Sequence, residues 1–286
     1  MKLHHTRLLI MSTLTQNTPA SIQLLLKAAA VTLLLQASPL HGQIISNNFN
    51  ALITGSNLGA PWTVTGTTVD QTVTIADVES PFTAIVGGKS VFLQDTDSTA
   101  TGDAAFRQTF TSYTSSTDGL NIQFDFQVPS SNTPAYIFSV NNSSSGQGFF
   151  MEFTVSNIGG GFDISYRGSS GGAGIQTTLA SNLDRSLWYN VAISTTPPGL
   201  TGDQFSLSVT PFGGSALTAN NNLFRNELAN IGEISFTSRN GQGFAGNFYV
   251  DNVLVSAIPE PGSVGLLLMG ALSLALRRMR RRVVAG

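Results

Sequence analysis

Apolar and polar residues alternate one by one through most of the middle of the chain. The segments LNIQFDFQV, at Leu120 to Val128, and QFSLSVTP, at Gln204 to Pro211, show this period of two most plainly. Neighbouring side chains of a β-strand point to opposite faces, so this alternation is typical of half-buried strands. Clusters of Gly, Asn, Ser and Pro separate the segments and indicate turns.

Eleven segments carry this strand pattern, and only Asn221 to Asn230 suggests a helical turn. So many short strands require two packed layers. We therefore predict an all-β, two-sheet antiparallel jelly-roll sandwich over residues 43–257. The predicted strands are Thr67 to Ile75, Ser90 to Gln94, Ala105 to Phe110, Leu120 to Val128, Ala135 to Val140, Gly148 to Val155, Phe162 to Arg167, Trp188 to Ser194, Gln204 to Pro211, Gly232 to Ser238 and Asn247 to Val255.

The predicted sandwich contains neither histidine nor cysteine, because His4, His5 and His41 all precede it and the chain has no Cys. This excludes Ser/His/Asp and Cys/His nucleophiles, zinc sites built on thiolate or imidazole, haem and iron–sulfur ligation, and disulfides. Residues 43–258 hold fifteen acidic and six basic side chains, a formal charge of −9. Such a body repels phosphate backbones, so we expect no nucleic-acid partner.

The first 42 residues have the layout of a secretory signal peptide. Scattered bases precede the apolar run Ile22 to Leu35, and the small residue Gly42 suits the position before a cleavage site. We therefore assign residues 1–42 as a signal peptide. The alternative is an N-terminal helix packed in the fold, and Met11 is an alternative start.

The last 29 residues combine a Pro-Glu-Pro motif, a short apolar run and a basic end. The apolar run supports a transmembrane helix over residues 262–276, which is shorter than the roughly twenty residues that cross a bilayer without distortion. The basic residues after it would hold that end on the cytoplasmic side. The motif residues are Pro259, Glu260 and Pro261, and the basic residues are Arg277, Arg278, Arg280, Arg281 and Arg282.

In this order, at a chain end behind a signal peptide, these three elements resemble the PEP-CTERM sorting signal of Gram-negative, often exopolysaccharide-producing bacteria. The resemblance covers residues 258–286. It implies that an exosortase recognises the Pro-Glu-Pro region and removes the tail, and that the protein passes from an inner-membrane intermediate to the cell surface or extracellular matrix. The alternative is a plain tail anchor that stays in place.

Four stretches of the middle region resemble the concanavalin-like or laminin-G-like jelly rolls of exported bacterial proteins. They are Asn48-Phe49-Asn50, GKSVFLQD, LDRSLWYNVAIS and GNFYVDNVLVS. In such sandwiches the first and last strands pair. A galactose-binding-like or carbohydrate-binding-module jelly roll has nearly the same rhythm of strands.

The acidic loop LQDTDSTATGD is a candidate calcium site. Asp95, Asp97 and Asp103 supply the hard oxygen donors that Ca²⁺ requires, although the loop lacks the twelfth-position Glu of an EF-hand. A solvated acidic loop is the alternative, and no cofactor is required by the sequence. Asp251 and Asn252 in the last predicted strand suit a similar structural site or a turn cap.

Aromatic side chains are candidates for stacking on sugar rings. We expect Trp62, Tyr113 and Tyr166 to line a ligand surface, and Trp188 to pack in the core between the sheets.

A carboxylate pair for glycoside hydrolysis is not evident on any one strand. Asp125, Glu152, Asp163 and Glu233 are isolated, and pairing of Asp125 with Glu152 across strands is the one geometry that would supply a pair. We therefore expect a non-enzymatic surface or matrix protein with a structural, adhesive or carbohydrate-binding role, partnered by exosortase, the membrane and extracellular polysaccharide. The alternatives are a glycan hydrolase or lyase of the same fold, or a permanently anchored binding module.

Overall fold

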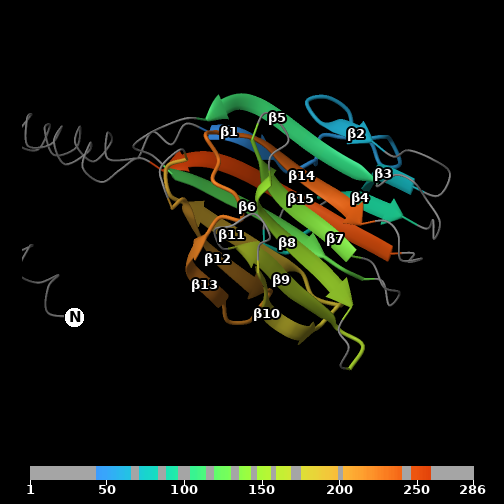
Figure 1. Ribbon diagram of the computed structural model, residues 1–286. Coiled ribbons are helices and arrows are strands. Elements are labelled where there is room, and N and C mark those ends of the chain that lie inside the picture. The colour runs from blue at the N-terminus through green and yellow to red at the C-terminus, as the bar shows by residue number, and fades with distance from the viewer. Residues whose placement is uncertain are drawn as a thin grey trace, which may run out of the picture. The chain divides into compact units, whose positions relative to one another are not determined.

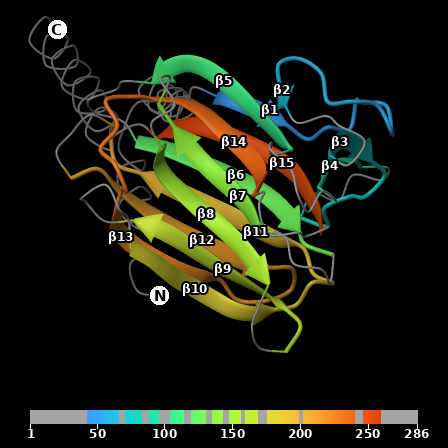
Figure 2. The same cartoon turned by 45° about the vertical axis from the view of Figure 1, so that its right-hand side comes forward.

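Two antiparallel β-sheets stack face to face in the computed structural model (Figures 1 and 2). The described residues form fifteen strands, and the predicted all-β sandwich is confirmed. The structure describes residues 43–65, 71–82, 88–95, 104–113, 119–129, 135–142, 147–155, 159–168, 175–198, 202–239 and 246–258.

The larger sheet, called sheet A below, has eight strands in the order β13-β12-β11-β6-β15-β4-β3, and β1 also pairs with β15. Its strands are β1 (Gln43–Asn47), β3 (Gln71–Ala76), β4 (Ser90–Asp95), β6 (Gly119–Gln127), β11 (Tyr189–Thr195), β12 (Gln204–Pro211), β13 (Leu217–Leu223) and β15 (Gly246–Ile258).

The smaller sheet, called sheet B, has seven strands in the order β10-β9-β8-β7-β14-β5-β2. Its strands are β2 (Thr63–Thr65), β5 (Ala105–Tyr113), β7 (Ala135–Asn141), β8 (Gln147–Val155), β9 (Phe162–Gly168), β10 (Ile175–Leu183) and β14 (Ile231–Arg239).

The first and last strands pair, as the jelly-roll resemblance implies. β15 pairs along one edge with β6, and along the other with β4 and then β1, where Ser46 faces Leu254. One long strand thus joins segments that are far apart in the sequence.

Aromatic rings fill the space between the sheets. Phe124 of β6 lies 4.6 Å from Phe138 and 5.1 Å from Phe236, both of sheet B, and Tyr136 of β7 stacks on Phe248 of β15 at 4.6 Å, measured between ring centroids. These side chains are fully buried, and each buried ring contributes about 1.5–3 kcal/mol to folding. Because the rings fix the inward face of each strand, the alternate residues must point outward from both sheets.

The sequence pattern missed β1, β2, β10 and β13, and it suggested a helical turn that is absent. Residues 217–223 form β13 and residues 224–230 are irregular, so the helical expectation for Asn221 to Asn230 is wrong. β10 and β13 are edge strands, and none of their residues is buried. Backbone pairing with a neighbour, rather than burial of one face, sets their conformation, and it leaves no alternation to detect.

Candidate functional site

The outer face of sheet B carries polar side chains that are largely buried although no second sheet covers them. Ser139 and Glu152 are only 3% and 4% exposed, and Asn141, Ser165 and Ser235 are also buried. Buried polar groups need hydrogen-bond partners. The side chains on this face satisfy one another in two clusters.

The first group, called the Asn141 cluster, joins three neighbouring strands. The Asn141 side-chain amide of β7 donates to Glu233 Oε1 of β14 at 2.9 Å and to the Ser139 hydroxyl at 3.2 Å. The Ser139 and Ser235 hydroxyls share a hydrogen bond of 2.7 Å, and Arg107 of β5 forms an ion pair with Glu233 at 3.7 Å. Asn141 Oδ1 is buried with no hydrogen-bond partner in the described part of the chain.

The second group, called the Gln176 cluster, lies on the other half of the face. Gln176 Nε2 of β10 donates to the Ser165 hydroxyl at 2.8 Å and to Glu152 Oε2 at 3.3 Å. Arg167 of β9 donates to Gln176 Oε1 at 3.4 Å. The amide of Gln176 therefore orients a carboxylate and a guanidinium on neighbouring strands.

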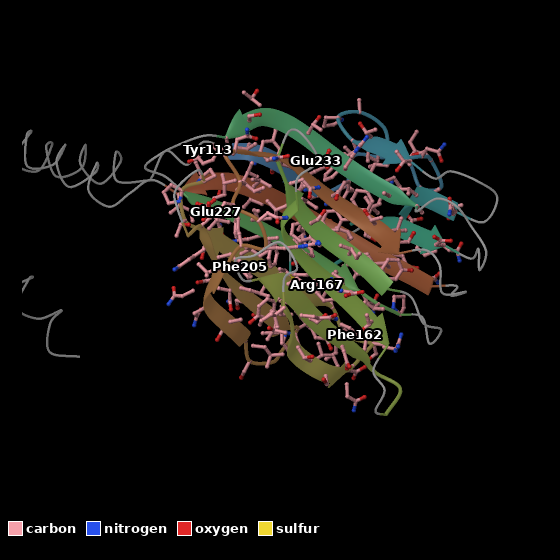
Figure 3. The ribbon with its side chains drawn as sticks, viewed as in Figure 1. Tyr113, Phe162, Arg167, Phe205, Glu227 and Glu233 are labelled. Carbon is pink, nitrogen blue, oxygen red and sulfur yellow. The ribbon has the colours of Figure 1, made fainter. Side chains whose placement is uncertain are left out.

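Strand register places the two arginines in one row across the sheet. Arg107 pairs with Ser235, Ser235 with Ser139, and Arg167 lies two strands beyond Ser139 in the same register. Four strand spacings separate the arginines by about 19 Å. Figure 3 labels Arg167 and Glu233, which represent the two clusters on this sheet. Within this row Arg107 is 47% exposed and Arg167 is half-buried, whereas Ser139 and Ser235 are buried beneath the surface.

The two glutamates of this face are too far apart to act as a glycosidase pair. Glu233 pairs with Asn141, whereas Glu152 pairs with Ile137, four residues away along β7. Strand geometry then separates their backbones by about 16 Å. The two carboxyl groups of a glycosidase lie about 5–9.5 Å apart.

A second polar group lies on the outer face of sheet A. Asp125 of β6 is directly opposite Asp251 of β15, and both are buried, at 1% and 2% exposed. Ser80 covers the pair, since its hydroxyl donates to Asp125 and its backbone N–H donates to Asp251. Asn190 and Asn252 each donate to Asp125 at 2.7 Å.

The environment of the pair favours its neutral forms. Burial raises the pKa of Asp125, against hydrogen bonds from Asn190, Ser80 and Asn252 that lower it. Burial first, and then the negative charges of Asp125 and Glu79, raise the pKa of Asp251 to about 7. Backbone N–H groups of Asn252 and Ser80 oppose this rise. The pair lies beneath Ser80 and is closed to a polymer.

Among the described residues no group of three or more His, Asp or Glu side chains is arranged to hold a metal ion. Asp95, one of the three predicted calcium ligands, ends β4, is 5% exposed and accepts a hydrogen bond from the Ser238 hydroxyl at 2.8 Å. Asp97 and Asp103 lie outside the described residues. The calcium loop stays a prediction.

Two of the three aromatic residues predicted to line a ligand surface are buried inside the protein. Trp62 is 5% exposed and packs against Phe49 and Phe106. Tyr166 points into the sandwich and donates to Asn222 at 3.0 Å. Tyr113 is half-buried at the end of β5. The stacking surface expected from these three rings is therefore not formed by Trp62 or Tyr166.

Trp188 is buried, as expected, but on the other side of its sheet. Its ring contacts Tyr249, which alternates with the core residues Phe248 and Val250 and so points outward from sheet A. It is absent from the cluster of side chains that fills the sandwich.

The predicted approach of Asp125 to Glu152 does not occur, because β6 belongs to sheet A and β8 to sheet B. The pairing of Asp125 with Asp251 was not predicted from the sequence. The sequence does indicate that Asp125 lies on the outer face, because it alternates with the apolar residues Phe124 and Phe126. The pairing of distant strands was not readable from that pattern.

Both predicted terminal segments lie outside the described residues. They contain the signal peptide over 1–42, the helix expected over 262–276, and the sorting residues Pro259, Glu260, Pro261, Arg277, Arg278, Arg280, Arg281 and Arg282. Within the described ranges the chain has no helix of the length and apolarity that spanning a bilayer demands.

No protein-family model matches the chain, and no curated protein matches it. Solved structures share its fold. A carbohydrate esterase from the Shiga toxin-encoding bacteriophage phi24B has a TM-score of 0.50 at 12% identity, over 77% of this chain and 100% of that chain.

Two further structures have lower scores. The alginate lyase Aly36B has a TM-score of 0.47 at 14% identity, over 74% of this chain and 95% of that chain. The CBM2 module of the evolved Dit protein of Lactobacillus casei BL23 phage J-1 has a TM-score of 0.47 at 13% identity, over 76% of this chain and 96% of that chain. At 12% identity, the likeness to the esterase is one of fold alone.

Proposed function

We propose that the protein is an exported, non-enzymatic polysaccharide-binding protein and that the outer face of sheet B is its binding face. The observation that supports this most directly is the pair of hydrogen-bonded clusters around Asn141 and Gln176. Binding sites for polar ligands need donors and acceptors held in place before the ligand arrives. Here the buried clusters hold Arg107 through Glu233 and Arg167 through Gln176.

The two arginines are the groups of this face that would bind a polysaccharide carrying carboxylates, against the formal charge of −9 on residues 43–258. Arg107 is 47% exposed, so its guanidinium is accessible, and Arg167 lies in the same row. Guanidinium groups bind carboxylates through two parallel hydrogen bonds. Uronic-acid residues along a polymer would present carboxylates to both arginines.

The absence of catalysis is supported by the chemistry of the same face. Glu152 and Glu233 are about 16 Å apart by strand geometry. Residues 43–258 contain no His or Cys that would act as a base or nucleophile. Export and sorting to the cell surface or matrix rest on the signal-peptide layout and on Pro259, Glu260 and Pro261.

Affinity electrophoresis of the full chain in gels containing alginate tests this function. Wild type is expected to be retarded, and Arg107→Gln with Arg167→Gln is expected to weaken binding by about tenfold or more, since charge-assisted hydrogen bonds are lost. Neither unsaturated ends nor new reducing ends should form. Unretarded wild type, or release of cut chains, would overturn the proposal.

A further inference from the structure

Aromatic side chains form a row across the outer face of sheet A, on the opposite side of the sandwich from the clusters described above. Phe92 of β4 pairs in register with Tyr249 of β15, and Tyr249 pairs with Gln127 of β6. Tyr189 of β11 pairs with Phe126 of β6 and with Pro211 of β12. Trp188, the residue before Tyr189, and Phe212, the residue after Pro211, therefore continue the row. The Phe212 N–H donates to the Trp188 carbonyl at 2.9 Å, which fixes this end.

The rings contact one another in two groups, Phe92 with Tyr249 and Trp188, and Phe82 with Phe212. The centroids of Phe92 and Tyr249 are 5.2 Å apart, and those of Trp188 and Tyr249 are 6.4 Å apart. Phe82, from the segment that covers the buried carboxylates, lies edge-on to Phe212 at 5.5 Å. The set Phe82, Phe92, Trp188, Phe212 and Tyr249 is called the aromatic row below.

The row is open to solvent in part. Phe212 is 48% exposed, and the rings of Phe82, Phe92 and Tyr249 are half-buried. Trp188 is buried with its ring against Tyr249, so it does not itself meet a ligand. Rings held on neighbouring strands of a sheet lose little freedom when they bind.

Uncharged amides flank the rings. Gln94 Nε2 donates to Asn247 Oδ1 at 3.1 Å, and Gln127 Nε2 donates to the Ser186 carbonyl. The side chains of Gln94, Gln127 and Asn247 are each half-buried. Aromatic faces beside neutral amides match a pyranose ring, which offers C–H groups on its faces and hydroxyls at its edge.

The width of the row argues against a protein partner. It is one residue wide, with polar residues Gln94 and Asn247 on one side and the carboxylates beneath Ser80 on the other. A stable protein interface needs about 20–30 residues on each partner. A narrow strip of this kind fits a single extended chain.

We propose that the aromatic row is a second glycan-binding site that takes a neutral polysaccharide by ring stacking. The site is independent of the face of sheet B, which carries the arginines. With one site on each sheet, a single molecule bridges two polysaccharide chains, and joint binding gains strength through effective concentration.

Affinity electrophoresis of the full chain in hydroxyethylcellulose gels tests the second site. Wild type is expected to be retarded, and the double variant Phe92→Thr with Phe212→Ser is expected to bind about tenfold more weakly, the loss of about two ring contacts. Both positions are on the surface of the sandwich, and Thr suits a strand, so folding should be kept. Ile175→Thr removes a 70% exposed apolar side chain from sheet B and should bind like wild type.

Several results would overturn this second site. One is wild-type protein that migrates unretarded through hydroxyethylcellulose. Another is a double variant that is retarded as strongly as wild type. Size-exclusion chromatography that shows a wild-type dimer and a monomeric double variant would assign the row to contact between copies instead. Retardation in alginate should be unchanged in the double variant, so failure here is separate from failure of the face of sheet B.

Discussion

Asp125 and Asp251 face each other across β6 and β15, and Ser80 donates to both, with its hydroxyl at 2.7 Å from Asp125 and its backbone N–H at 3.3 Å from Asp251. Their burial places two acids side by side where water cannot solvate two charges. Nearby like charges and low solvation both disfavour ionisation. Protonation of the pair therefore couples the stability of the fold to pH. The pair also joins the segment around Ser80 to sheet A through hydrogen bonds.

The pH dependence of stability follows from this linkage. The pKa of Asp251 is raised to about 7, above its ordinary value of 3.8, so the folded protein holds a proton that the unfolded chain releases. The free energy of unfolding should therefore fall as pH rises from about 4 to about 7, by at most about 1.4 kcal/mol per pH unit. Urea unfolding of the full chain at several pH values measures this slope.

Asp251→Asn is the matched control for that slope. It keeps the size of the side chain and removes its titration, so its stability should change less between pH 4 and pH 7 than that of wild type. Asp184→Asn, at an exposed carboxylate, should keep the wild-type slope. Equal slopes in Asp251→Asn and wild type would contradict the role of the buried pair.

Calcium is expected to raise the melting temperature by mass action, because it binds the folded state. The prediction rests on the loop carboxylates Asp95, Asp97 and Asp103. Differential scanning calorimetry in millimolar Ca²⁺ and in chelator measures it, and Asp97→Asn should remove the difference. If Asp251→Asn removes it instead, the buried pair supplies the ligands, and identical melting curves for wild type would refute calcium binding.

A glycine in β6 offers a local test of sheet A. A Cβ at Gly119 would lie 1.8 Å from the carbonyl oxygen of Thr195 in β11, and no side chain can relieve that overlap because the obstacle is backbone. Gly119→Ala should lower the free energy of unfolding by about 1–3 kcal/mol. Gly59→Ala is the control, since nothing lies within 4 Å of its Cβ, and equal stability of the two variants would contradict the strand pairing.

Alternation identified the strands at the centre of the sheets because there one face is buried and the other is polar. It predicted β6 and β12 closely, through Phe124, Phe126 and Leu207. It could not give the strand order, because pairing joins residues such as Asp125 and Asp251 that are 126 positions apart. Long-range register depends on the packing of the whole core.

The candidate sites were harder to foresee for the same reason. Asn141 and Gln176 are unremarkable polar residues in the sequence, and only the neighbouring strands supply Glu233 and Glu152 as their partners. A single aromatic residue in the sequence does not show which surface it will reach, so Trp62 was expected at a surface that it does not reach. The aromatic row forms only when five separate segments come together.

The last prediction concerns Pro259, Glu260 and Pro261, which follow directly after the last strand. Each proline fixes its φ and lacks an amide hydrogen, so neither a helix nor a strand ladder can continue through them. We therefore expect the segment between the sandwich and the apolar run to be extended, as a processing enzyme requires of its substrate. The five arginines after the apolar run should fix the depth of this segment at the membrane.

In the native host the mature protein is thus expected to lack its C-terminal segment. Replacing the three motif residues with alanine should leave an unprocessed, membrane-bound form, detected by mass spectrometry of membrane and surface fractions, whereas the matched control Ser263→Ala should be processed like wild type. Replacing the five arginines should impair orientation and reduce processing. Peptides extending through Arg277 in the surface fraction, or wild-type sorting of the alanine variant, would show instead that residues 258–286 act as a plain tail anchor, because a retained apolar run keeps the protein at the membrane.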